Sequence, residues 1–218
     1  MYDAQYIRYF TGIKLNRIKI LPLLGLQSTV GVSYKPEHNQ FIVGPSRLPH
    51  ALEEKLKLKT TANEFVYMYN EHGKSLLCPH EIIKYKAILL MPNDVTSREM
   101  TELYRINIPI FVPSQELMSK WIKKHDLVAD RNLMKTILGM DRSLVDAAPR
   151  KTSKQVVPDP NENSKESIAH WIQYADFYNW PHVITFDSFA DFIAKYESAK
   201  LNQISEQMAA ENEQIVKK

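Results

Sequence analysis

A turn at residues 44–47 carries side chains that can hold a phosphate group. It contains Gly44, Ser46 and Arg47 in the order Gly-Pro-Ser-Arg. Glycine lets a ligand approach the backbone closely, and the planar guanidinium of arginine can pair two phosphate oxygens at once. A helix is expected after this turn, and the positive end of its dipole favours an anion. These residue types therefore predict a contact with a phosphorylated ligand.

A second polar segment, residues 93–97, offers similar chemistry. Asn93, Thr96 and Ser97 supply a side-chain amide and two hydroxyl groups just before another expected helix. That helix carries Glu102, whose carboxylate can accept hydrogen bonds from the hydroxyl groups of a ribose. The segment and Glu102 together predict a site for an anionic ligand that carries a ribose.

The elements that position both segments are indicated by the apolar runs beside them. Residues 87–91 and 108–112 are apolar, and the stretch between them has room only for a loop and a short helix. This pattern is typical of a strand, a crossover helix and a second parallel strand. A shorter apolar run, residues 41–43, precedes the first turn. Because open α/β sheets bind ligands outside the carboxyl ends of their strands, both segments lie where a ligand is expected.

Strands expected near residues 41, 64, 87, 108 and 183 alternate with helices along the chain. This alternation predicts an α/β fold, with a Rossmann-like parallel sheet and helices on both faces. A further helix, capped by Asp187 and Ser188, is expected after the last strand. The other expected helices span residues 2–12, 48–58, 79–86, 115–125 and 164–178.

Three regions flank or interrupt this Rossmann-like domain, which is expected to span residues 41–200. Residues 1–40 are interpreted as a helix, a strand at residues 17–24 and a connector, the remnant of a preceding domain. The polar residues 128–165 are interpreted as an insertion. Residues 201–218 predict a helical tail whose apolar face lies across another surface.

Composition argues against several classes of protein and site. The 218 residues carry a formal net charge of +3, and the lysines are spread along the chain, so nucleic-acid binding is not indicated. The single cysteine, Cys78, excludes an internal disulfide bond. The isolated residues Asp94, Asp159 and Asp187 form no carboxylate pair, so no metal site is expected. No run reaches the roughly 20 apolar residues of a membrane span, and the first residues lack the apolar core of a signal peptide, so the compartment stays open.

The segment around Glu102 resembles the carboxyl-terminal half of glycosyltransferases of the GT-B fold. In that family a strand leads into a small polar loop with a proline, the next helix carries a glutamate, and a proline seven residues later opens a strand. This chain has Met91 and Pro92 at the strand end, Glu102 on the helix and Pro109 seven residues after it. Residues 105–107 replace the small residue and glycine that usually precede the family's second proline.

The resemblance covers residues 41–114 and, in the order of the elements only, residues 164–195. It implies that Glu102 binds the ribose of a nucleoside diphosphate sugar, that residues 92–97 face the sugar and diphosphate, and that residues 44–47 flank the diphosphate. It implies that no metal is needed, and that the nucleotide sugar is the substrate and not a cofactor. It also implies that the chain is a donor-binding half, which needs an amino-terminal half or a partner chain for glycosyl transfer.

Other interpretations of the same residues stay open. Glu102 can be a solvated helix residue paired with Arg105, and Arg47 can be a surface cation in a turn. The aromatic residues at positions 171–189 favour packing over a platform for a sugar. A different function is a non-catalytic Rossmann-like module that binds a nucleotide or docks a partner protein, and docking predicts an exposed apolar patch around residues 177–180.

Overall fold

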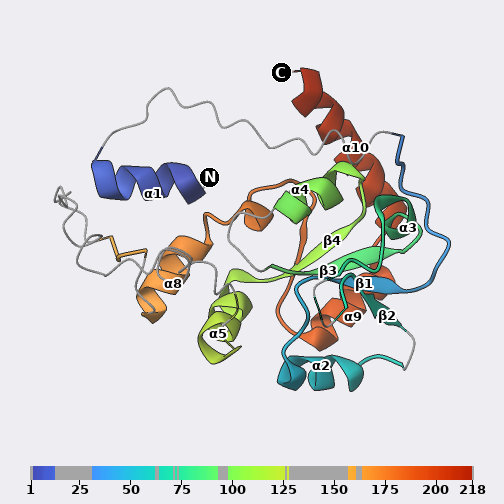
Figure 1. Ribbon diagram of the computed structural model, residues 1–218, viewed down its shortest axis with the longest axis horizontal. Coiled ribbons are helices and arrows are strands. Elements are labelled where there is room, and N and C mark those ends of the chain that lie inside the picture. The colour runs from blue at the N-terminus through green and yellow to red at the C-terminus, as the bar shows by residue number, and fades with distance from the viewer. Residues whose placement is uncertain are drawn as a thin grey trace.

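A sheet of five parallel strands lies at the centre of the fold (Figure 1). The computed structural model of the chain describes residues 2–12, 31–61, 64–70, 72, 74–92, 98–125, 127, 157–160 and 164–217. Its strands are β1 (Phe41–Pro45), β2 (Phe65–Tyr67), β3 (Ala87–Met91), β4 (Ile110–Pro113) and β5 (Ile184–Phe186). All neighbouring strands pair in parallel. The Rossmann-like α/β class predicted from the sequence is therefore confirmed.

The strand order determines where a ligand site is expected. The order is β2-β1-β3-β4-β5, so the chain moves outward from β1 to β2 and then returns past β1 to β3. This is the order of flavodoxin-like doubly wound sheets, in which the winding reverses between β1 and β3. Such sheets bind ligands in the crevice outside the carboxyl ends of these two strands.

Helices cover both faces of the sheet. On one face lie α2 (His50–Lys57) and α9 (Phe189–Ser198), and on the other lie α3 (Pro79–Ile82), α4 (Arg98–Arg105) and α10 (Leu201–Lys217) (Figure 1). Successive strand residues point to opposite faces, so Phe41 and Leu89 pack with the first group while Ile42 and Leu90 pack with the second. Burial on both faces explains why β1, β3 and β4 are continuous apolar runs in the sequence.

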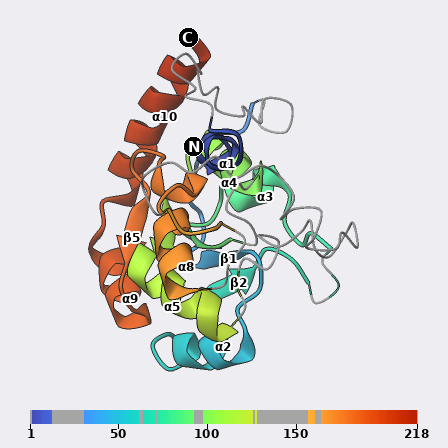
Figure 2. The same cartoon turned by 90° about the vertical axis from the view of Figure 1, so that its left-hand side faces the viewer.

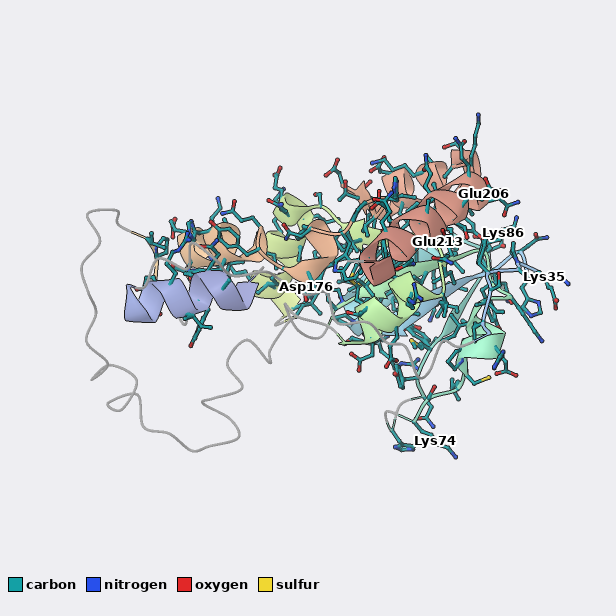
Figure 3. The ribbon with its side chains drawn as sticks, turned by 90° about the horizontal axis from the view of Figure 1, so that it is seen from above. Lys35, Lys74, Lys86, Asp176, Glu206 and Glu213 are labelled. Atoms are coloured by element: carbon teal, nitrogen blue, oxygen red, sulfur yellow. The ribbon has the colours of Figure 1, made fainter. Side chains whose placement is uncertain are left out.

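Further elements lie toward the carboxyl edge of the sheet. They are α1 (Tyr2–Thr11), α5 (Gln115–His125), α8 (Lys165–Ile172) and the 3₁₀ helix η2 (Asp176–Tyr178). Helix α5 packs against α8, as Figure 2 shows. The rings of Tyr9 in α1 and Trp171 in α8 have centroids 5.7 Å apart. Figure 3 shows α1 alongside α8, with Lys35 and Lys86 at the opposite end of the molecule.

The regions outside the central domain are described in part. Helix α1 ends before Gly12, which has a φ of 67° and donates its amide to the Arg8 carbonyl at 2.9 Å, so the first expected helix is confirmed. The strand expected at residues 17–24 lies outside the described residues, as does most of 128–165. The helical tail is confirmed as α10, and its Met208 is fully buried. Within the described ranges, no helix is both long and apolar enough to pass through a membrane.

Strand β1 is longer than the sequence predicts. A turn was expected at residues 44–47, but Gly44 and Pro45 belong to β1 and pair with the last two residues of β3. The end of a strand tolerates proline, which has no amide hydrogen to donate. The turn therefore begins at Ser46, and α2 begins at His50.

Candidate functional site

The two segments predicted to bind phosphate follow neighbouring strands. Pro45, the last residue of β1, pairs in register with Met91, the last residue of β3. The first segment continues from β1 through Ser46 and Arg47, and the second continues from β3 toward α4. Because the winding reverses between β1 and β3, both segments leave the sheet at the crevice where doubly wound sheets bind ligands.

The second segment is bounded by described elements on both sides. Strand β3 ends at Met91, and α4 begins at Arg98. Asn93, Thr96 and Ser97 lie outside the described residues. Their contacts with a ligand therefore stay a prediction.

Arg47 is held by two tyrosines at the end of β2. Its guanidinium carbon lies 3.8 Å from the ring centroid of Tyr67, and its Nη1 donates a hydrogen bond to the Tyr69 carbonyl at 3.4 Å. A cation over an aromatic ring contributes about 0.5–1 kcal/mol at exposed sites. Among the described residues, Arg47 forms no ion pair with a carboxylate. The fold thus holds a positive charge next to the end of β1.

One carboxylate of α2 contributes to the field around Arg47. The pKa of Glu53 lies below its ordinary value, mainly because Lys57 donates a hydrogen bond to it, with smaller contributions from Tyr67 and Arg47. Lys57 Nζ lies 2.9 Å from Glu53 Oε1. Lys57 therefore compensates most of the negative charge of Glu53, and Arg47 contributes a smaller part.

The backbone of the first segment is used within the protein. The Ser46 amide donates to the Met91 carbonyl at 3.0 Å. A Cβ placed on Gly44 would lie 2.6 Å from the Cβ of Met68, so the close approach that glycine permits is made by Met68. A ligand at this segment would therefore meet the side chains of Ser46 and Arg47 and not the Ser46 amide.

Glu102 lines a small cavity on the α4 side of the sheet. The cavity has a volume of about 130 Å³, and Tyr69, Ser75, Glu99 and Glu102 are among its lining residues. It is smaller than the roughly 300 Å³ at which ligand pockets begin, so it has room for only part of a ligand. The pKa of Tyr69 is raised, first by burial and then by the charges of Glu99 and Glu102. Tyr69 thus faces Glu102 with its side chain and Arg47 with its carbonyl.

Just after the end of α4, the backbone adopts a conformation that glycine favours. Asn107, within the three residues that depart from the glycosyltransferase pattern, has a φ of 60°. This left-handed region is open to glycine and, among other residues, most readily to asparagine and aspartate. The asparagine therefore allows the backbone a conformation that the usual glycine would also allow.

A larger cavity lies at the carboxyl ends of β4 and β5. Its volume is about 440 Å³, which is within the range of ligand pockets, and Ser114, Glu116, Trp180 and Asp187 are among its lining residues. The carboxyl edge is therefore hollowed both near β2 and at β5. Sequence reasoning did not single out this second cavity, because it depends on η2 packing beside β5.

The aromatic residues near this cavity are mostly packed inside the protein. Phe177 and Trp171 are 0% and 2% exposed. The rings of Trp180 and Tyr104 have centroids 4.4 Å apart. The prediction that these residues pack is confirmed. The large apolar side chains that are exposed among the described residues lie elsewhere, at Ile7, Leu58 and Leu76, so the apolar patch that docking of a partner predicts is not found at residues 177–180.

Sequence reasoning missed the two tyrosines that hold Arg47. Both were expected only as residues of one strand, but β2 ends at Tyr67 and Tyr69 follows it by two residues. Their contact with Arg47 depends on β2 pairing with β1, which places Tyr67 beside Val43 near the end of β1. Local sequence does not specify which strand lies beside which, so only the alternation itself could have been noticed.

Potential metal ligands do not gather in the part of the chain that the structure describes: no group of three or more His, Cys, Asp or Glu side chains there could hold an ion. Comparison of the chain with protein-family models, with curated proteins and with solved structures gives no match.

Proposed function

We propose that this chain binds a nucleoside diphosphate sugar at the carboxyl edge between β1 and β3, as the donor-binding half of a glycosyltransferase. The observation that carries this proposal is the pairing of Pro45 with Met91, which places side by side the ends of the two strands that precede the polar segments. That crevice is the usual ligand site of a doubly wound sheet.

The charges around the crevice support separate roles for two residues. Arg47 would pair the diphosphate, because it is positioned by Tyr67 and carries no ion pair among the described residues. Glu102 would accept hydrogen bonds from the ribose, because it faces a concavity that also holds Glu99 and therefore repels phosphate. A nucleotide bound in this way has its anionic part near β1 and its neutral sugar near α4.

The proposed reaction is glycosyl transfer to a hydroxyl group. The bond between the anomeric carbon and the diphosphate oxygen would break, and the acceptor oxygen would bond to that carbon and lose its proton to a base. Arg47 would stabilise the departing diphosphate, since preorganised positive groups act most strongly where charge develops. The base and the acceptor site are assigned to a second half or a partner chain.

Calorimetric titration with uridine and guanosine diphosphates tests the binding step. We expect saturable binding of one of them. Arg47→Ala and Glu102→Gln should each weaken it about tenfold or more, since hydrogen bonds to charged groups contribute roughly 1.5–3 kcal/mol.

Two variants provide matched controls. Arg8→Ala removes an exposed arginine of α1, and Glu197→Gln alters an exposed glutamate of α9 on the other face of the sheet. Both should bind the nucleotide as the unmodified chain does. The proposal fails if neither nucleotide binds, or if the control variants lose as much affinity as the site variants.

A further inference from the structure

Four lysines gather in a groove between α5 and α8, away from the β1/β3 crevice. Lys120, Lys123 and Lys124 come from one face of α5, and Lys165 comes from the start of α8. The groove has a volume of about 800 Å³, within the range of small-molecule sites. Helical spacing explains the three lysines of α5, since residues three and four apart share a face.

The groove carries an excess of positive charge. Glu116 is the one carboxylate among its described lining residues, and its Oε1 lies 2.7 Å from Lys120 Nζ. Lys123, Lys124 and Lys165 form no ion pair with any described residue. Like charges held together on packed helices repel one another and reduce stability.

Two observations indicate that these charges are not placed for the stability of the fold. Lys165 is the first residue of α8, where a positive charge opposes the helix dipole. The pKa of His125, at the end of α5, is lowered first by burial and then by the charges of Lys124 and Lys55, so the positive field extends to α2. An anion in the groove would offset both the charge of Lys165 at the start of α8 and the positive field around His125.

The lysines are also well positioned for binding. Helix α5 packs against α8, and the buried Met118 and Ile122 of α5 share a core with Ile168 of α8. Lysine side chains line such a groove with their apolar stems and keep the ammonium groups at its rim. Several ammonium groups converging from two fixed helices suit a ligand that carries several negative charges close together.

We propose that the α5–α8 groove binds a polyphosphorylated ligand. Clustered phosphate groups provide the charge density that matches several ammonium groups, each acting as a point charge. The ligand can be a free small molecule or the headgroup of a phosphorylated lipid, because both present the same chemistry. This site is independent of the proposed nucleotide-sugar site.

Titration of the full chain with inositol hexakisphosphate tests the proposal, and vesicles with and without phosphatidylinositol 4,5-bisphosphate distinguish a lipid source from a free one. We expect saturable binding in at least one arm, weakened by added salt. Lys123→Ala and Lys165→Ala should each reduce affinity about fivefold, and the double variant should reduce it about 25-fold.

The control is the double variant Lys35→Ala with Lys200→Ala, which removes the same charge. Both lysines are exposed, and Figure 3 shows Lys35 at the end of the molecule opposite α8. A second variant, Lys123→Glu, should abolish binding yet raise the melting temperature of the free protein, because it removes repulsion within the groove. The proposal is overturned if neither phosphate probe binds, or if the control double variant loses as much affinity as the groove variants. It is also overturned if single-stranded RNA binds and neither phosphate probe does.

Discussion

The side chain of Asn212 donates a hydrogen bond to the side-chain oxygen of Asn107 at 2.6 Å. Asn212 belongs to α10 and is 3% exposed, while Asn107 follows the last turn of α4. The same side-chain nitrogen, Asn212 Nδ2, also donates to the Tyr104 carbonyl at 3.0 Å. The carboxyl-terminal helix is thereby fixed to the helix that carries Glu102.

Replacement of Asn212 by alanine should destabilise the protein by about 1–3 kcal/mol, because the buried Tyr104 carbonyl and the half-buried side-chain oxygen of Asn107 lose their donor. Urea unfolding followed by circular dichroism measures the change. Asn202→Ala, at an exposed position of the same helix, should change stability by less than about 0.5 kcal/mol. Equal effects of the two substitutions would contradict the assigned role of Asn212.

Two substitutions at Asn107 separate backbone strain from the hydrogen bond. Both Asn107→Gly and Asn107→Ala remove the bond to Asn212, but only alanine places a Cβ at a φ of 60°. We expect the alanine variant to be less stable than the glycine variant by about 1–2 kcal/mol in the same unfolding experiment. If the alanine variant were as stable as the glycine variant, the left-handed conformation would not be required at residue 107.

Gly44→Ala should destabilise the sheet by about 1–3 kcal/mol, because the added methyl group overlaps the Cβ of Met68. The contact is with a Cβ and not with a flexible side-chain end, so the double variant with Met68→Ala should not recover the loss. Thermal unfolding of the single and double variants makes the comparison, and recovery in the double variant would contradict the geometry.

The pairing of Asp191 with Lys195 predicts an acid-dependent contribution to stability. The pKa of Asp191 is lowered from its ordinary 3.8, mainly by the hydrogen bond from Lys195 and then by the Asp187 amide. A lowered pKa in the folded state gives stabilisation that is fully present above the ordinary value and is lost as the pH falls below it. Because the pair is partly exposed, we expect Asp191→Asn to cost roughly 0.5 kcal/mol at neutral pH. The cost should shrink toward zero below pH 3.8 in unfolding curves, and a pH-independent cost would be inconsistent with the pairing.

The sequence predicted the elements whose pattern is local. The apolar run at 87–91 and the amphipathic run at 115–125 match β3 and α5 at both ends. The cap at Ser188 is also as predicted, since its side chain accepts from the Asp191 amide at 3.1 Å. In each case the signal lies in the spacing or the cap chemistry of one segment.

Features that depend on pairing between distant segments could not be predicted. Gly44 and Pro45 are typical of a turn, yet β3 extends the ladder along β1 to Pro45. The contact of Arg47 with Tyr67 requires β2 to lie beside β1. The lysine groove likewise requires α8 to bring Lys165 to α5, although the three lysines of α5 could have been grouped from their spacing.

Nuclear magnetic resonance mapping of backbone amides during addition of uridine or guanosine diphosphate locates the bound nucleotide and so tests whether it lies between β1 and β3. We expect the largest shift changes at Ser46, Arg47 and the Glu99–Glu102 turn of α4, while the α5–α8 groove changes little. Shift changes confined to that groove or to the cavity at β4 and β5, or none at all, would contradict this placement of the nucleotide.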